Sequence, residues 1–550
     1  MKRLLAVRIF AVFVLIMLAL GTAPVLAEDS PGSANTNTNT TVNGPTPNPY
    51  LASSLYGIVH FDSSSSDAMP YGPPKGVYVI NPAQQPIAYG GPGTIMTLAS
   101  THPQYMWHPS TDRLQYIRKS GGGWVTVAEM HVLNKLAKDT FPKISDKTLR
   151  AFGKATAVGM TPTTLIAQMK SLFGDNYASR GGGGVYSLVD NKNVFYSMYN
   201  GVILGFALKD ENNPAAGIKI KYRLDDPVTK IQGTSGARVV ALQMTYDGHL
   251  VVTFSNGLAI IDRELTLSTN SYYAFGTGER VTNSTCVDEN NAVYVASNTV
   301  MRKLVWTGTA LSDHAGDGAW SCPYTTDSSK APIGRMDNGT GSTPTLMGFG
   351  NDADKLVIIT DGAKVMNLVA FWRDEIPSGF TDRVAGQIPV TCGFNPVPEW
   401  IQSEQSVVVR GYGAFVENNV PESIDAELLA TPSTYTYLLG PAYTPARGVE
   451  RFAWDTTTHS WSSTWARTDA VGSPIPSYSA AGNMVLITGW IPDVGWAIHG
   501  MDWDTGDTVH LTFLGQKNFG NGLYGLLQGL KNGDLLFNGV CGTIRLHYEQ

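Results

Sequence analysis

The chain has 550 residues, of which 43% are hydrophobic and 15% charged, a balance that excludes a disordered or fibrous protein. Its 58 glycines, 31 prolines and 10% aromatic residues favour a turn-rich all-β fold over a helical one. The formal net charge of −6 argues against a protein that binds nucleic acid through a basic surface.

The N-terminus has the features of a secretory signal peptide. Basic residues precede an apolar run at residues 9–20, and small side chains stand just before a cleavage point after Ala27. The run is shorter than the ~20 residues that span a bilayer, which disfavours the alternative of an uncleaved anchor. We expect residues 1–27 to be removed, so that the protein is secreted or periplasmic with no remaining membrane span. The Asn-, Thr- and Pro-rich residues 28–50 are interpreted as a disordered leader.

A strand–turn–strand unit recurs along the rest of the chain. In its clearest copy, an Asp-Gly turn joins apolar runs at residues 239–244 and 250–254, and such turn residues tolerate the positive φ of tight hairpins. Repeats of about 40–60 residues, each a small antiparallel sheet, are typical of propeller blades. We predict an all-β fold, a β-propeller of seven or eight blades over residues 51–550, with stacked β-sandwich domains as the alternative. The turn residues of the repeats are Asp190, Asp247, Asn290, Asp354, Asn483 and Asn532.

The last strand-like run, residues 543–548, alternates apolar and polar side chains. We expect it to lie inside a blade, because pairing the two ends of the chain would close the ring and remove two exposed sheet edges.

One segment, about residues 126–174, suits helices rather than strands. Helices are predicted at residues 128–138 and 161–174, the second with Thr161 as N-cap, Pro162 in its first turn and Gly174 as its stop. We interpret this segment as a helical insertion that packs on the first blades, with a lid over the channel as the alternative.

Four cysteines are spread along the chain without any Cys-x-x-Cys motif, which excludes a zinc ribbon, a thioredoxin-type site and a haem attachment site. An even number in an exported protein permits two disulfides, and buried thiols are the alternative. The cysteines are Cys286, Cys322, Cys392 and Cys541.

Two groups of acidic residues are candidate metal sites. His60 with Asp62 and Asp67 offers an imidazole and carboxylates, although a solvated turn is the simpler interpretation. Asp502 and Asp504 could bind calcium, but alternate residues on a strand often merely end a blade. We therefore predict no metal site.

The segment from Gly500 to Gly506 follows the first half of the Ala-x-Asp-x-x-Thr-Gly-x-x-x-Trp motif that ties quinoprotein blades together, with His510 in place of the tryptophan. The segment from Ala453 also begins like the motif and then departs from it at His459 and Ser463. With these motifs, residues 180–548 resemble the secreted members of the quinoprotein-alcohol-dehydrogenase-like β-propeller superfamily. The resemblance implies a propeller fold and pyrroloquinoline quinone or calcium as cofactor, although the adjacent cysteine pair of many alcohol-oxidising members is missing.

Three arginines stand just before the predicted first strands of their blades, which run beside the axis. They are Arg180, Arg238 and Arg280, at eight to ten positions before the blade turns. If they converge on one rim of the channel, their planar donors would hold a carboxylate, sulfate or phosphate group. Local salt bridges are the alternative.

The same reasoning places Ser342, Glu404 and Asn521, from later blades, near the same opening. Glu404 is the best single candidate for a general base, because neighbouring cations would keep it ionised.

Three functions remain open, since propellers host all of them. The protein could bind a small, anionic ligand or a protein partner at the channel without catalysis. It could instead be an enzyme, either a quinone-dependent oxidoreductase or a metal-dependent hydrolase of the lactonase kind. A structural role at the cell surface is the third possibility.

Overall fold

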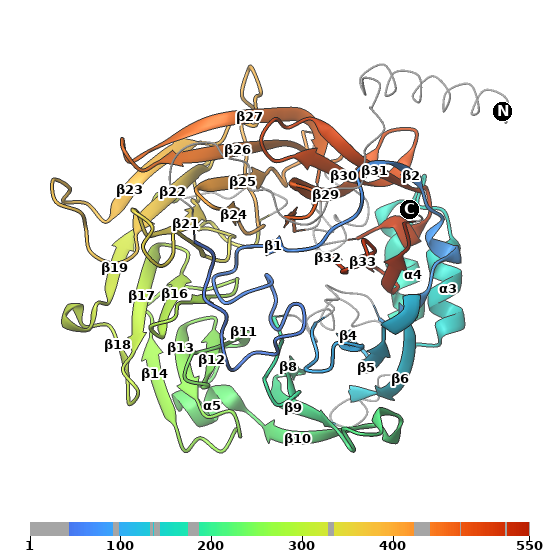
Figure 1. Ribbon diagram of the computed structural model, residues 1–550, viewed down its shortest axis with the longest axis horizontal. Coiled ribbons are helices and arrows are strands. Elements are labelled where there is room, and N and C mark those ends of the chain that lie inside the picture. The colour runs from blue at the N-terminus through green and yellow to red at the C-terminus, as the bar shows by residue number, and fades with distance from the viewer. Residues whose placement is uncertain are drawn as a thin grey trace, which may run out of the picture. The chain divides into compact units, whose positions relative to one another are not determined.

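The computed structural model describes residues 43–91, 98–132, 136, 144–173, 186–327, 335–422, 440–472, 475–522 and 525–548. These residues belong to one compact unit and form eight β-sheets, most of them of four antiparallel strands. Figure 1 shows the sheets following one another in chain order around a common centre. The fold is therefore all-β and propeller-like, as the repeats predicted.

The first four sheets have the following strands. One holds β4 (Tyr105–Pro109), β5 (Leu114–Arg118) and β6 (Val125–Met130). The next holds β7 (Leu188–Val189), β8 (Phe195–Tyr199), β9 (Val202–Leu208) and β10 (Ile218–Leu224). The third holds β11 (Val239–Met244), β12 (Leu250–Phe254), β13 (Gly257–Ile261) and β14 (Asn270–Ala274). The fourth holds β15 (Cys286–Val287), β16 (Ala292–Ala296), β17 (Val300–Trp306), β18 (Leu311–Ser312) and β19 (Trp320–Pro323).

The other four sheets complete the series. The fifth holds β20 (Thr345–Met347), β21 (Leu356–Thr360), β22 (Asn367–Trp372) and β23 (Val384–Pro389). The sixth holds β24 (Val408–Arg410), β25 (Gly413–Glu417), β26 (Arg447–Asp455) and β27 (Ser460–Val471). The seventh holds β28 (Ser477–Ser479), β29 (Met484–Ile491), β30 (Gly495–Asp502) and β31 (Thr508–Gly515), with β1 (Ala68–Met69) and β2 (Gly76–Val79) added at its edges. The eighth holds β32 (Leu527–Gly529), β33 (Leu535–Gly539), β34 (Gly542–Leu546) and β3 (Ile87–Tyr89).

The turn between β11 and β12 shows why the repeat forms where the sequence predicts it. Gly248 has φ +91, a conformation that favours glycine, and a Cβ there would lie 2.5 Å from the Tyr50 ring. Both strands have the predicted bounds and are wholly or nearly wholly buried. Gly248 is therefore needed for the backbone conformation of the turn and also for the close packing of Tyr50 against it.

The eighth sheet joins the two ends of the described chain. Strand β34 pairs with β33 on one side and with β3 on the other, with Ile544 opposite both Phe537 and Ile87. The C-terminal strand thus lies inside a sheet, as its alternation predicted, and an N-terminal strand forms the outer edge.

Neighbouring sheets are tied together by aspartates of the repeat turns. Trp306 on β17 donates its indole N–H to Asp247 Oδ2 of the preceding sheet at 2.9 Å. Trp454 on β26 donates in the same way to Asp354 Oδ2 of the preceding sheet at 2.8 Å. These bonds to carboxylates give each sheet a fixed place beside its neighbour.

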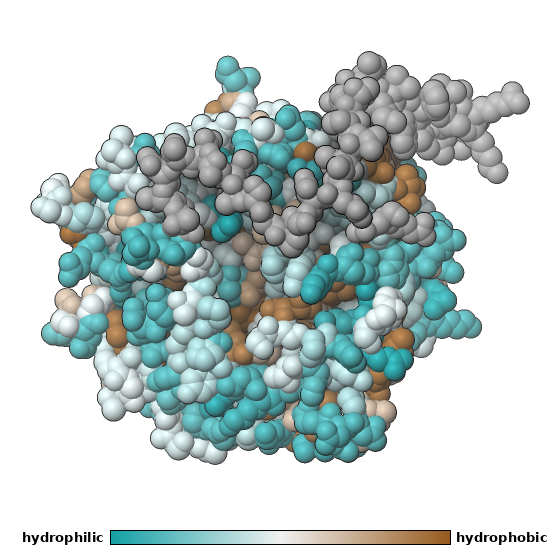
Figure 2. Space-filling view, viewed as in Figure 1, coloured by the Kyte–Doolittle hydropathy of each residue, from teal (hydrophilic) through white to brown (hydrophobic). Residues whose placement is uncertain are grey.

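The residues between 48 and 72, here called the axial segment, run between the innermost strands of the sheets. In Figure 1 this segment, in dark blue, crosses the centre of the ring, and Figure 2 shows a hollow there with hydrophobic residues visible. Its carbonyls accept hydrogen bonds from amides that face the axis, so the segment is held between the inner strands. Four consecutive sheets each donate one such bond at 2.8–3.0 Å, from Val287 to Ser63, Leu346 to Ser64, Val409 to Ser66 and Tyr478 to Asp67.

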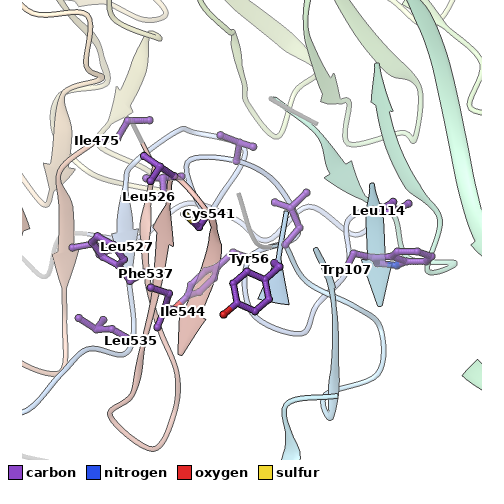
Figure 3. Close-up of a cluster of buried hydrophobic side chains, with 14 of the residues drawn as sticks. Tyr56, Trp107, Leu114, Ile475, Leu526, Leu527, Leu535, Phe537, Cys541 and Ile544 are labelled. Carbon is purple, nitrogen blue, oxygen red and sulfur yellow. The ribbon is translucent and has the colours of Figure 1, made fainter. Parts of the chain in front are cut away.

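The axial segment also supplies part of the largest hydrophobic core cluster. Tyr56 is 2% exposed and lies among side chains of the eighth sheet, including Leu527 and Phe537 (Figure 3). Its hydroxyl donates to the carbonyl of Gly529 at 2.6 Å, so the buried phenol has a partner. Apolar contacts and hydrogen bonds together hold the segment in place.

The helical insertion differs from the prediction at its start. Residues 128–130 belong to strand β6 (Val125–Met130), where a helix at 128–138 was expected. The helix prediction is wrong at these residues because β6 begins with a β-branched run and pairs with β5. This pairing overrides the helix preference of the residues that follow. Residues 133–135 and 137–143 lie outside the described part.

Two helices do form in the insertion. Helix α4 (Pro162–Phe173) confirms the predicted one, with Thr161 Oγ1 accepting from the Thr164 amide. The sequence did not predict α3 (Asp146–Lys154), in which Gly153 packs against the ring of Phe519. A third helix, α5 (Pro227–Gln232), follows β10. In the described part of the chain, no helix is both long and apolar enough to cross a bilayer.

The four cysteines are free thiols, and three of them are buried. The structure thus agrees with the alternative of buried thiols rather than with two disulfides. Burial raises the pKa of the Cys541 thiol well above its usual range, which keeps it protonated.

Candidate functional site

Segments that lead into three consecutive inner strands meet at one end of the axis. Ser342, before β20, donates its hydroxyl to the Gln405 carbonyl before β24 at 2.9 Å. Asn283, before β15, donates its amide to the Glu404 carbonyl at 3.3 Å. Asn283 precedes the fourth sheet and Glu404 the sixth, and sheets that are not neighbours come within hydrogen-bond distance near the axis, so these segments form a rim. The axial mouth is defined here as Tyr186, Asn283, Arg335, Ser342 and Glu404.

A buried ion pair lies at the axial mouth. Arg335 Nε is 3.2 Å from Glu404 Oε1, with the guanidinium fully buried and the carboxylate side chain 7% exposed. Arg335 Nη1 donates to the Ser403 carbonyl at 2.9 Å, and the Met336 amide donates to Glu404 Oε1 at 2.7 Å. Gly341 lies so close to Glu404 that a Cβ there would approach the carboxyl carbon to 2.6 Å. The pair is therefore held by backbone and side-chain contacts together.

A second polar pair, from the axial segment, lies beneath the mouth. His60 Nδ1 is 2.8 Å from Asp67 Oδ1, and the two side chains are 1% and 0% exposed. His60 Nε2 lies 3.4 Å from Thr343 Oγ1, which donates to Ser284 Oγ at 3.3 Å. Burial raises the pKa of Asp67, and the neighbouring His60 opposes that rise.

The backbone at this pair is strained. His60 has φ +66 and Asp67 has φ +53, in the left-handed region that side-chain-bearing residues rarely adopt. Tyr186 at the mouth has φ +47 as well, and its ring centroid lies 5.9 Å from that of His60. Strain of this kind persists only where surrounding contacts fix the backbone. The hydrogen bonds from sheet amides to the carbonyls of the axial segment do so here.

Tyr186 links the mouth to the pair beneath it. Its hydroxyl donates to Asn283 Oδ1. Burial first, and then the Glu404 and Asp67 charges, raise the pKa of the phenol well above its usual range. Tyr186 is therefore a neutral hydrogen-bonding group at physiological pH.

A buried acid, Glu417, adjoins the mouth at the end of β25. Asn419 connects the two: it donates to Glu417 Oε1 at 3.1 Å and accepts from the Glu404 amide at 3.1 Å. Burial raises the pKa of Glu417 to about 8. Gly472 lies against the Glu417 carboxyl, whose Oε2 has no hydrogen-bond partner within the described ranges.

The site residues predicted from sequence fall into two groups. Ser342 and Glu404 come together at the mouth, because Ser342 donates to the carbonyl of Gln405, the residue after Glu404, and Gly341 lies against the Glu404 side chain. Asn521 is buried beside Val540 of its own sheet, whose amide donates to the Asn521 carbonyl at 3.1 Å.

The predicted arginines are not seen together. Arg180 lies outside the described residues. Arg238 is exposed, and its amide donates to Ser255 Oγ. Arg280 is exposed and donates two bonds to Asp337 at 2.8 and 2.9 Å, the local salt bridge weighed as the alternative. A ligand role for these arginines stays a prediction.

Sequence reasoning missed Arg335 and Thr343 at or below the mouth, and Glu417 beside it. Arg335 stands in a loop without any periodic pattern, and its partner Glu404 is 69 positions away in the chain. Thr343 and His60 are 283 positions apart. The one usable signal was position, since Thr343 directly follows the predicted site residue Ser342.

The described residues do not fit the quinone cofactor that the resemblance implies. A planar tricarboxylate needs open space between the inner strands, but the axial segment lies there and is hydrogen-bonded to four consecutive sheets.

The described residues also lack the donor set of a metal centre. No three His, Cys, Asp or Glu side chains among them are grouped to hold an ion. Asp502, weighed as a calcium ligand, accepts the amides of Asp504 and Thr505 and lies 3.5 Å from Lys75 Nζ. The Asp502 carboxylate therefore stabilises the turn that follows it and pairs with Lys75.

Comparison with known proteins gives matches of low sequence identity. No family model matches it. It is 28% identical over 379 residues to an uncharacterized protein of Archaeoglobus fulgidus, covering 66% of this chain and 70% of that one. Two solved structures are similar at 10% identity and a TM-score of 0.48: the quinohemoprotein alcohol dehydrogenase from Comamonas testosteroni (90% of this chain, 80% of that one) and a europium-containing methanol dehydrogenase (88% of each). A putative 6-phosphogluconolactonase from Bacteroides fragilis is similar at 9% identity and a TM-score of 0.39, over 78% of this chain and 95% of that one.

Proposed function

We propose that this protein is an exported, eight-bladed propeller that binds a small anionic ligand at the axial mouth and does not transform it. The signal-peptide pattern of residues 1–27 supports export. The eight described sheets and the pairing of β3 with β34 support a closed ring of eight blades.

The buried Arg335–Glu404 pair carries the proposal for the ligand. A guanidinium offers planar pairs of donors that match a carboxylate, sulfate or phosphate group. Glu404 now occupies one edge of Arg335, as a built-in carboxylate. A ligand anion would take the place of this side chain, and the neighbouring hydroxyl and amide groups of Tyr186 and Asn283 would orient it.

The test is to remove the built-in anion. In Glu404→Gln the buried Arg335 guanidinium loses its charged partner, which destabilises the protein. An added anion that binds Arg335 would then stabilise this variant more than it stabilises wild type. We expect citrate or sulfate to raise the Tm of Glu404→Gln more than that of wild type, and to have no such effect on Arg335→Gln. Glu399→Gln is the matched control, because Glu399 pairs with Lys364 on the surface. Equal responses of wild type, Glu404→Gln and Glu399→Gln would refute the proposal.

The exposed arginines are tested in the same assay. If Arg238→Ala/Arg280→Ala responds to citrate like wild type, both arginines are structural and the ligand belongs to Arg335 alone. A reduced response would add them to the site.

A hydrolase is the second candidate, and the Asp67–His60–Thr343 arrangement favours it. A carboxylate that orients an imidazole, with a hydroxyl at the other ring nitrogen, is the geometry of an activated nucleophile. The Thr343 hydroxyl, which donates to Ser284 in the structure, would first turn its proton toward His60. His60 would take that proton as the hydroxyl oxygen attacks an ester carbonyl, then pass it to the departing alcohol, and water would release the acyl group. A fluorophosphonate probe should then label Thr343 in wild type but not in His60→Gln. Absence of labelling would leave binding as the function.

A further inference from the structure

A cavity of about 480 Å³ lies away from the axis, where the sixth and seventh sheets meet the helical insertion. Its walls come from the segment that leads into β26, from the end of β27, from the turn between β29 and β30, and from Val158 of the insertion. Ligand sites form preferentially at such junctions, and this volume lies within the range of about 300–1,000 Å³ that small-molecule pockets occupy. None of the residues of the axial mouth lines it.

Two ion pairs lie at the wall of the cavity, and within each pair the two charges cancel. Arg447 Nη2 donates to Glu422 Oε1 at 2.6 Å. Asp469 accepts from Arg467 at 2.9 and 2.6 Å, and the hydrogen bonds from Arg467 hold the pKa of Asp469 below its usual range. Arg447 and Asp469 thus line the cavity as a fixed guanidinium and a fixed carboxylate, and Asp493 adds a second carboxylate, so the lining has no excess of positive charge to attract an anion.

One donor in the wall has no hydrogen-bond partner among the residues that the structure describes. Arg447 Nε is buried and makes no hydrogen bond to the described residues. A buried guanidinium N–H without an acceptor costs free energy, which a ligand oxygen at this position would recover. The Gln516 side chain also lines the cavity and donates to the Asp493 carbonyl at 3.1 Å, which leaves its amide oxygen as a further acceptor.

The apolar part of the wall is aromatic and rigid. Trp490 lines the cavity with only 5% of its surface exposed, and it packs edge-on against Trp496 with ring centroids 5.2 Å apart. Gly440, at φ +95, lies directly against Trp490, where any Cβ would collide with the side chain. Tyr443 lines the cavity as well. Trp490 and Tyr443 thus give the cavity an aromatic wall.

We infer that this cavity binds a neutral saccharide. Sugar rings present C–H faces that lie well against aromatic rings, and pairs of hydroxyls that match planar guanidinium, carboxylate and amide groups. Arg447, Asp469 and Gln516 supply the three planar polar groups, and Trp490 supplies the ring. Because the lining has no excess of positive charge, it favours a neutral sugar over a uronic acid or a sulfated one. This inference does not depend on the anion site at the axial mouth.

The experiment uses the mature full-length protein and isothermal titration with maltose, cellobiose, mannobiose and lactose, with digalacturonic acid as the acidic counterpart. We expect at least one neutral disaccharide to bind, and Arg447→Leu to weaken that sugar's binding at least 10-fold. Asp469→Asn should also weaken binding of that sugar. It should leave the Tm unchanged, because the Asp469 side chain is exposed and asparagine has nearly the same shape. Arg223→Leu is the matched control, because Arg223 is also 37% exposed and also pairs with a nearby carboxylate, Asp225.

Three results would overturn the inference. The first is that none of the four neutral sugars binds. The second is that Arg447→Leu and Arg223→Leu weaken binding equally, which would place the sugar elsewhere. The third is that digalacturonic acid binds more tightly than every neutral sugar, which would show that the guanidinium acts as an anion site.

Discussion

Replacing the buried acid Glu417 by glutamine should make the stability of the protein less dependent on pH. Glu417 accepts one bond from Asn419, at Oε1, and Gly472 packs against its carboxyl. Burial raises its pKa from 4.5 to about 8, so the folded protein holds this proton at neutral pH and the unfolded chain does not. Glutamine has nearly the same shape as the protonated acid and carries no proton to lose.

The sign and size of the effect follow from proton linkage. Between pH 4.5 and about 8 the folded state binds more protons than the unfolded state, so the free energy of unfolding falls as the pH rises. Each pH unit across that window is worth about 1.4 kcal/mol. The contribution of Glu417 is fully present below pH 4.5, and up to about 5 kcal/mol of it is lost by pH 8.

Guanidinium chloride unfolding at pH 5, 6.5 and 8 measures this loss, with a constant m-value as the check on two-state behaviour. The difference in unfolding free energy between Glu417→Gln and wild type should grow in favour of the variant by a few kcal/mol from pH 5 to pH 8. Glu375→Gln, at an exposed position, should show no such trend. Parallel pH profiles for wild type and Glu417→Gln would refute the reasoning.

Three further predictions concern the architecture. Deleting residues 540–550 removes β34 and the pairing with β3, so we expect loss of soluble protein; a soluble truncation with unchanged Tm would contradict ring closure. Trp306→Phe removes the bond to Asp247, a hydrogen bond to a charged group, and should cost about 1.5–3 kcal/mol of unfolding free energy, whereas no loss would show that the tie is dispensable. His60→Ala leaves the Asp67 carboxyl buried without its partner and should cost about 3–5 kcal/mol, measured by denaturant unfolding; a loss under 1 kcal/mol would show that the pair is not needed to hold the axial segment.

The sequence by itself determined the local elements. The apolar runs around the Asp-Gly turn placed β11 and β12 with their observed bounds, and the Thr161 cap and Pro162 placed α4. These features depend on residues close together in the chain, where side-chain periodicity, turn chemistry and capping act directly. The same local preferences failed at β6, where pairing with β5 decided the structure.

Only the tertiary structure decided how the centre of the ring is filled and which polar groups meet there. The pairing of Arg335 with Glu404 and of His60 with Thr343 joins residues that no local pattern relates. Their positions follow from the packing of successive sheets around the axis and from the bonds that hold the axial segment between the inner strands. Burial, which sets the pKa of Glu417, arises from the same packing, because desolvation is a property of the assembled ring and not of any stretch of sequence.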